Sequence, residues 1–151
     1  MKYLLIIVTL LSVTLAFTFT ERVDQQSISE HTFSTTKADE QAIDWKKINL
    51  EEAQKLSKKT GKPIYMDISA VWCGYCKKMK KNVYSTAKVA SKMNDSYIAI
   101  SIDGEKGEGI ALVKKHKIKG YPTQLILDAE GNVLKRNNGY MSESKLLAFI
   151  K

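Results

Sequence analysis

Cys73 and Cys76 are the only cysteines in this sequence of 151 residues, and just two residues separate them. A disulfide between them would close a very short loop, so it would restrict the unfolded chain little and add little stability. A structural zinc site needs about four ligands. The other soft candidates, His31 and His116, lack ligand-like spacing to the pair, and His116 is expected at the surface. Redox chemistry is therefore the favoured interpretation of the pair.

The pair lies where a predicted strand changes into a helix. Residues 63–69 form a short, largely apolar run that is typical of a buried strand. Cys76, Met79 and Val83 then follow the spacing of one helix face, with lysines on the other, which places Cys73 at the helix N-terminus. Unpaired backbone N–H groups and the helix dipole favour a negative charge there. In such motifs the thiol pKa falls from about 8.5 to between about 3.5 and 7.5. Cys73 is thus the expected nucleophile and Cys76 the resolving thiol.

Two separate motifs carry a family resemblance. Trp-Cys-Gly-Tyr-Cys-Lys at 72–77 resembles the active site of the thioredoxin superfamily, and Gly-Tyr-Pro-Thr at 120–123 resembles the element that faces it in that family. The resemblance covers about residues 43–151 and is closest to exported thioredoxin-like proteins, including the C-terminal domain of the periplasmic disulfide reductase. It implies an α/β thioredoxin-like fold, with a central mixed β-sheet flanked by helices. It also implies thiol–disulfide oxidoreductase activity with no cofactor besides the Cys73–Cys76 disulfide.

The resemblance also assigns roles to individual residues. Asp67, six residues before Cys73, matches a buried acid that manages the proton of the resolving cysteine, so the implied catalytic set is Cys73, Cys76 and Asp67. The Tyr121–Pro122 bond is expected to be cis. The residues that the resemblance places at the substrate surface are Trp72, Gly74, Tyr75, Tyr121, Pro122 and Gly139.

Three positions depart from thioredoxin itself. Ala99 stands where thioredoxin has a lysine near the buried acid, Ser69 replaces a tryptophan, and Tyr75 replaces the proline between the cysteines. The lysine's contribution to the acid is therefore missing at Ala99. The Gly-Tyr pair between the cysteines is similar to that of the periplasmic disulfide isomerase.

The N-terminal segment predicts export. Residues 1–20 begin with Lys2 and continue with an apolar run, which is typical of a secretory signal peptide. The alternative is an uncleaved membrane anchor over residues 4–19, which is about the shortest length that spans a bilayer. Residues 21–42 are polar and predict a flexible tether, and residues 43–151 form the predicted thioredoxin-like domain. The domain is expected outside the cytoplasm, in the periplasm or an equivalent compartment.

The formal net charge of +8 is compatible with acidic partners or anionic membrane surfaces. Because lysines and acids are interspersed, a solvated surface is favoured, and no stripe of arginine and aromatic residues indicates nucleic-acid binding. The expected partners are protein thiols and disulfides together with a membrane electron donor, and the protein is expected to be a monomer. Three functions stay open: a disulfide reductase, an isomerase or oxidant, and a binding module without turnover.

Periodicity and turn residues predict the remaining elements. The expected helices cover about 49–59, 86–93 and 110–116, with a last one that begins at 142. The expected strands cover 97–102, 123–127 and 133–136, and the last two form a hairpin.

Overall fold

A computed structural model describes residues 42–151. The predicted signal or anchor and nearly all of the predicted tether lie outside these described residues. The strands are β1 (Ile64–Ser69), β2 (Ile98–Asp103), β3 (Thr123–Leu127) and β4 (Val133–Asn138). The helices are α2 (Leu50–Thr60), α3 (Gly74–Asn82), α4 (Ala87–Ser96), α5 (Glu108–Lys115) and α6 (Glu143–Phe149). These bounds agree with the predicted elements to within about two residues at nearly every end.

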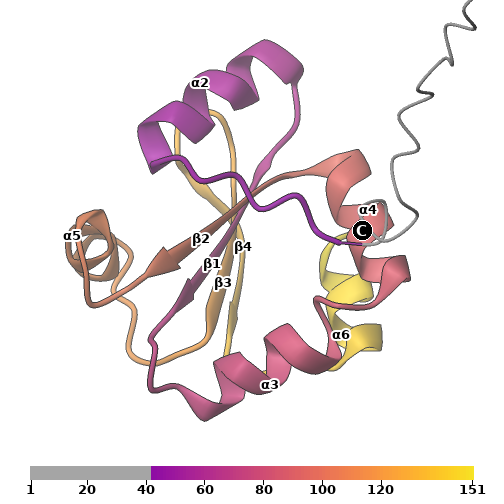
Figure 1. Cartoon of the computed structure of the whole chain (residues 1–151). Coiled ribbons are helices and arrows are strands. Elements are labelled where there is room, and N and C mark those ends of the chain that lie inside the picture. The colour runs from indigo at the N-terminus through magenta and orange to yellow at the C-terminus, as the bar shows by residue number, and fades with distance from the viewer. Residues whose placement is uncertain (1–41) are drawn as a thin grey trace, which may run out of the picture. The chain divides into compact units, whose positions relative to one another are not determined.

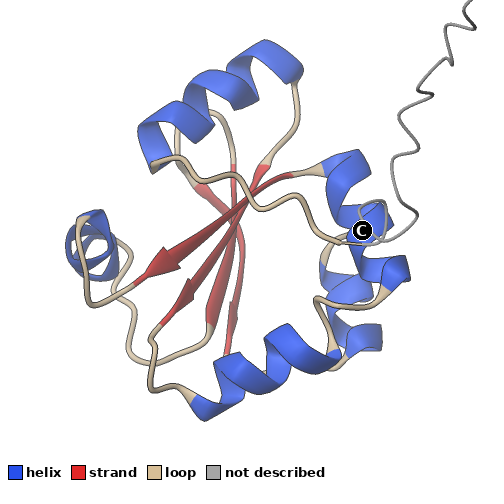
Figure 2. Ribbon diagram, viewed as in Figure 1, coloured by secondary structure: helices blue, strands red, loops and turns tan. Residues whose placement is uncertain are grey.

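The four strands form one mixed sheet in the order β2-β1-β3-β4 (Figure 2). β1 is parallel to β2 and antiparallel to β3, and β3 and β4 form the predicted antiparallel hairpin. β1 is buried along its whole length, as its apolar sequence predicts, whereas β4 is an exposed edge strand. The predicted mixed sheet flanked by helices is therefore confirmed.

Helices cover both faces of the sheet (Figure 1). α2 and α5 pack on one face, over residues such as Met66, Ile100 and Leu125. α3, α4 and α6 pack on the other face, over residues such as Tyr65 and Ile126. Because successive side chains of a strand point to opposite faces, Asp67 lies on the same face as Tyr65, beneath α3. Within residues 42–151, no helix is long and apolar enough to cross a membrane.

Local sequence explains how the first helix begins and ends. The side chain of Asn49 accepts a hydrogen bond from the N–H of Glu52, whose carboxylate accepts one from the N–H of Asn49. This arrangement is a capping box, which gives hydrogen-bond partners to two N–H groups that have none within the helix. Gly61 ends the helix with φ of 73°, in the left-handed region that favours glycine.

The prediction that His116 is a surface residue is wrong, since its side chain is buried. His116 ends α5, and its carbonyl accepts a hydrogen bond of 2.5 Å from the guanidinium of Arg136 on β4. This long-range contact draws the end of the helix against the sheet. Burial, together with the charges of Lys115 and Arg136, lowers the pKa of the imidazole.

Candidate active site

The two cysteines lie at the N-terminus of α3, as predicted. Cys73 is the N-cap residue, and its Sγ accepts a hydrogen bond of 3.1 Å from the backbone N–H of Cys76. The two sulfur atoms are joined in a disulfide. The helix therefore directs an N–H donor at the sulfur of Cys73, an arrangement that favours negative charge on that atom once the disulfide is reduced.

The disulfide is covered on one side by the loop that precedes β3. Tyr121 packs against a small buried cluster that consists of Ala70, Cys73 and Cys76. The bond between Tyr121 and Pro122 is cis, as predicted. Cys73 is 3% exposed and Cys76 is 4% exposed, so the covering residues leave little of either sulfur open.

Tyr121 is itself held from two directions. Its ring contacts Trp72 edge to face, with the ring centroids 5.9 Å apart. The Trp72 indole N–H donates to both carboxylate oxygens of Glu105, at 2.9 and 3.0 Å. A side chain at Gly104 would collide with the Tyr121 ring, so glycine is required at 104 for the ring to lie there.

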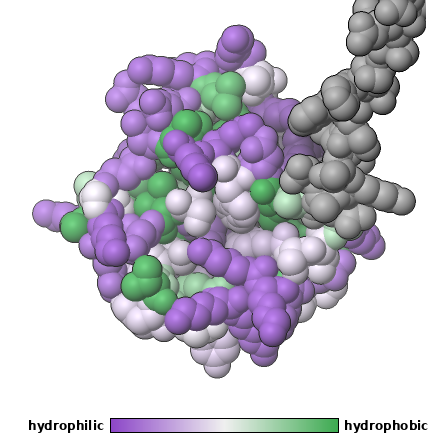
Figure 3. Space-filling model, in the orientation of Figure 1, coloured by the Kyte–Doolittle hydropathy of each residue, from purple (hydrophilic) through white to green (hydrophobic). Residues whose placement is uncertain are grey.

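An exposed apolar patch borders the disulfide. Val71, Trp72 and Tyr75 are 65%, 65% and 64% exposed, although all three have large apolar side chains. On the face of the molecule in Figure 3, which is hydrophilic over most of its area, hydrophobic side chains gather in small separate patches. Large exposed apolar side chains around a reactive group are typical of a surface that contacts other proteins.

Asp67 lies deeper, in a buried polar network. Its Oδ1 accepts a hydrogen bond of 2.9 Å from the hydroxyl of Tyr84 and a longer one of 3.4 Å from the amide of Gln124. The Tyr84 hydroxyl is also 3.0 Å from that of Tyr65, and Asn137 donates to the Gln124 side-chain oxygen at 2.7 Å. Burial raises the pKa of Asp67, and the two hydrogen bonds oppose that rise because they favour the ionised form.

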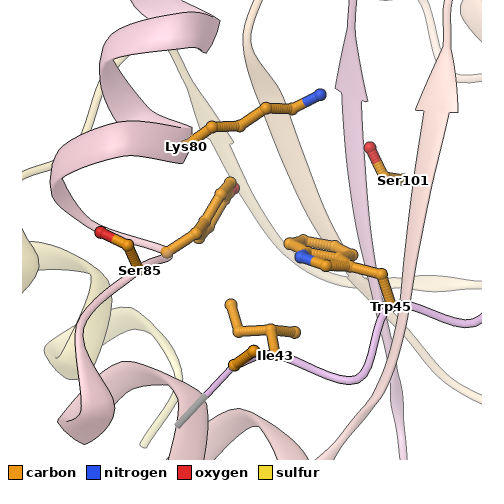
Figure 4. Close-up of a pocket in the computed structure, with 7 residues that line it drawn as sticks. Ile43, Trp45, Lys80, Ser85 and Ser101 are labelled. Carbon is orange, nitrogen blue, oxygen red and sulfur yellow. The ribbon is translucent and has the colours of Figure 1, made fainter. Parts of the chain in front are cut away.

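A hollow of about 640 Å³ lies beside this network, between α3 and β2. Ile43, Trp45 and Tyr84 line it, and Lys80 and Ser101 extend toward it from α3 and β2 (Figure 4). The ammonium of Lys80 further opposes the rise in the pKa of Asp67. Ala99, where thioredoxin has a lysine, pairs with Tyr65 in the sheet, so Lys80 is the cation that faces the acid from a different element.

The predicted surface residues come together around the disulfide. Trp72, Gly74, Tyr75, Tyr121 and Pro122 flank it, and Gly139 joins them because its N–H donates to the Pro122 carbonyl at 2.7 Å. The prediction that Asp67 is buried is confirmed, since it is 1% exposed. The roles in catalysis and substrate binding remain predictions.

Sequence reasoning missed four residues of the site. Tyr84, Gln124 and Glu105 are described above, and Tyr140 lies with its ring 6.5 Å from that of Tyr75 and 5.1 Å from the Lys78 ammonium. Gln124 could have been recognised from the sequence, because it is a polar residue within a predicted strand that is otherwise largely apolar. Tyr84 could not have been recognised from the sequence, since it follows the end of α3 and contacts Asp67 only in the folded chain.

Comparison with known proteins places this geometry in a family. The family model for the thioredoxin-like domain matches residues 50–151, which is more than half of the chain. The chain belongs to the thioredoxin-like family. The redox centre of such proteins is the cysteine pair itself. Within residues 42–151, no group of three or more His, Cys, Asp or Glu side chains is placed to hold a metal ion.

Individual relatives agree with this assignment. The chain is 28% identical over 135 residues to the thiol:disulfide interchange protein DsbD of Citrobacter koseri. The aligned region covers 85% of this chain and 24% of that protein. It is 31% identical over 107 residues to DsbD of Yersinia pestis, with 68% of this chain and 18% of that protein covered. The chain thus spans about a quarter or less of the length of these curated relatives.

Solved structures support the same fold. A candidate disulphide-isomerase from Bacteroides thetaiotaomicron superposes with a TM-score of 0.65 at 32% identity, covering 72% of this chain and 89% of that one. The oxidised C-terminal domain of DsbD from Neisseria meningitidis gives a TM-score of 0.55 at 21% identity, with 64% and 85% covered. At 21% identity, the similarity to the DsbD domain shows only that the two proteins share a fold. Together these findings describe a thioredoxin-fold protein that is related to thiol–disulfide oxidoreductases and has a disulfide-forming cysteine pair.

Proposed function

We propose that this protein is an exported disulfide reductase that uses Cys73 and Cys76 as its redox pair. The observation that carries the proposal is the hydrogen bond from the Cys76 N–H to the Cys73 Sγ at the start of α3. It selects Cys73 as the thiol that ionises in the reduced protein and places Cys76 one turn inside the helix. The relationship to proteins named for thiol:disulfide interchange supports the same chemistry.

Reduction of a substrate disulfide proceeds through two thiol–disulfide exchanges. The Cys73 thiolate attacks one sulfur of a substrate disulfide, which forms a mixed disulfide and releases the other substrate sulfur as a thiolate. The Cys76 thiol then loses its proton and attacks the Cys73 sulfur, which releases the second substrate thiolate. Two electrons pass to the substrate, and Cys73 and Cys76 end as the disulfide. A dithiol donor must reduce this disulfide before the next cycle.

Asp67 is proposed to accept the Cys76 proton. It lies on the face of β1 beneath α3, the helix that carries Cys76, and burial raises its pKa towards the range that such a proton transfer needs. Tyr121 and the exposed Trp72 and Tyr75 are proposed to contact the substrate, because they border the disulfide. Gly74, Pro122 and Gly139 would shape the backbone around it.

The compartment and donor rest on the N-terminal sequence and on the DsbD relatives. The signal-like residues 1–20 support export, and a membrane dithiol protein is the proposed electron donor. A second candidate is disulfide isomerisation or oxidation. The Gly-Tyr pair between the cysteines and the similarity to the candidate disulphide-isomerase favour it.

The reduction potential of the Cys73–Cys76 couple distinguishes the two candidates. Equilibration with glutathione, followed by thiol trapping, is expected to give a reduction potential of about −270 mV, as for thioredoxin. A reduction potential of about −120 mV would favour the oxidant or isomerase instead. Insulin reduction that persists in Cys73→Ser would contradict both, because each needs the Cys73 thiolate. Wild-type protein that does not reduce insulin would instead indicate a binding module. Cys76→Ser is expected to accumulate the mixed disulfide with substrate.

A further inference from the structure

A groove of about 570 Å³ lies beside the loop that covers the disulfide. The segment after α5 forms one wall, and the end of β4 forms the other. Three of its lining residues are cations and none is acidic: the lining is Lys117, Lys119, Gly120, Tyr121, Arg136, Asn138 and Gly139. Tyr121 also packs against the cysteines, and Gly139 contacts Pro122, so the groove adjoins the candidate active site.

These cations are available to a ligand. Lys117, Lys119 and Arg136 are all exposed, and none lies within ion-pair distance of a carboxylate among residues 42–151. The Arg136 guanidinium donates to the His116 carbonyl, which fixes it at the groove while leaving its charge unneutralised. Three unpaired cations in one concave surface produce a positive potential that attracts acidic groups.

Lys117 occupies a backbone position that favours glycine. It has φ of 52°, in the left-handed region, at the turn that ends α5. The N–H of Ile118 donates there to the Val113 carbonyl and that of Lys117 to the Lys114 carbonyl. Such a turn favours glycine at this position. The lysine therefore adds nothing to the turn, and its side chain contributes to the lining of the groove.

The charge changes sign across Tyr121. Outside the groove lining, Glu105 holds the indole of Trp72, which packs against Tyr121, and Asp103 lies at the end of β2. An extended substrate that crosses the covering loop therefore meets acids on one side and cations on the other. This asymmetry discriminates between substrates by the charge of the residues on one side of their cysteine.

We infer that the groove formed by Lys117, Lys119 and Arg136 binds an acidic stretch that flanks the target cysteine of a protein substrate. The inference rests on the proposed reductase function and adds the substrate class. Its occupant is a peptide segment with two or more Asp or Glu residues, since their carboxylates match the cations by charge and the groove adjoins the disulfide.

The test compares peptides that carry one cysteine as a mixed disulfide with 2-mercaptoethanol. The Asp peptide is made in two forms, with Asp at the three positions either before or after the cysteine and Ser at the three on the other side, and the matched Ser peptide has Ser at all six positions. The variant is Lys117→Gly/Lys119→Gln, in which the glycine suits the turn. The control is Lys88→Gln/Lys92→Gln, which removes the same charge from exposed positions on α4.

The wild-type protein is expected to reduce one form of the Asp peptide with a higher kcat/KM than the Ser peptide, and salt should diminish the difference. The groove variant should lose about fivefold on that form, as expected for two exposed ion pairs, and little on the Ser peptide. Equal rates for all three peptides, or equal losses in the groove and control variants, would overturn the inference.

Reduction of the neutral bis(2-hydroxyethyl) disulfide by each protein separates the two proposals. If this small disulfide is reduced but the Asp peptide has no advantage, the reductase function stands and the acidic-segment inference fails. If the wild-type protein reduces neither the small disulfide nor the peptides, the proposed function fails, and the inference fails with it.

Discussion

The substitution Tyr84→Phe tests the buried network around Asp67 most directly. It removes the hydroxyl that donates to Asp67 at 2.9 Å and leaves the ring, which packs against Trp45 with its centroid 5.1 Å away. A hydrogen bond to a charged group contributes about 1.5–3 kcal/mol, and one between neutral groups about 1 kcal/mol. The hydroxyl therefore stabilises the ionised carboxylate more than the protonated one, and its loss should raise the pKa of Asp67 further.

Stability measurements should show the same asymmetry. Below the folded pKa of Asp67, which burial raises, the carboxyl is neutral and the substitution should cost about 1 kcal/mol. Above that pKa the carboxylate is ionised, and the cost should rise to roughly 1.5–3 kcal/mol. Each additional unit in the pKa of the folded state corresponds to about 1.36 kcal/mol, so the two measurements check each other.

The assay is urea unfolding of the oxidised protein at one pH below and one pH above the pKa of Asp67, which NMR titration of its carboxyl carbon locates. Oxidised protein is used because disulfide-bonded cysteines do not titrate. Tyr97→Phe is the matched control, since it removes a hydroxyl from the same aromatic cluster without touching Asp67. A cost that is equal below and above the pKa of Asp67, or a pKa of Asp67 that stays unchanged or falls, would refute the reasoning.

Three further predictions follow from individual contacts. Because the folded protein binds the Asp67 proton more tightly than the unfolded chain, stability should fall as pH rises from about 3.9 through the folded pKa, and stay lower above it. Asp67→Asn should remove this dependence and be about 1–3 kcal/mol more stable above the folded pKa of Asp67, by urea unfolding; an unchanged pH dependence would contradict the assignment. Gly104→Ala should displace the Tyr121 ring and accelerate reduction of the disulfide by dithiothreitol, whereas Gly74→Ala, where a side chain meets open space, should not. Asn49→Ala should remove the cap of α2 and cost about 1 kcal/mol in thermal unfolding with redox activity unchanged; lost activity would link α2 to the site.

The sequence by itself determined the local parts of this protein. The change from an apolar strand to a helix face placed Cys73 at the N-terminus of α3, and Asn49 with Glu52 marked the start of α2. Hydrophobic period, caps and turn residues act between near neighbours in the chain, so they can be read without the fold. The cis bond at Pro122 and the burial of Asp67 were predicted only through the family resemblance.

Tertiary structure alone decided which distant residues meet. Tyr84 and Gln124 contact Asp67 from 17 and 57 residues away. Arg136 lines the same groove as Lys117 and Lys119 because the order of strands brings the edge strand beside the end of α5. His116 is buried as well, although a surface position was predicted. Such contacts depend on chain topology and packing, which place side chains together whatever their separation in sequence.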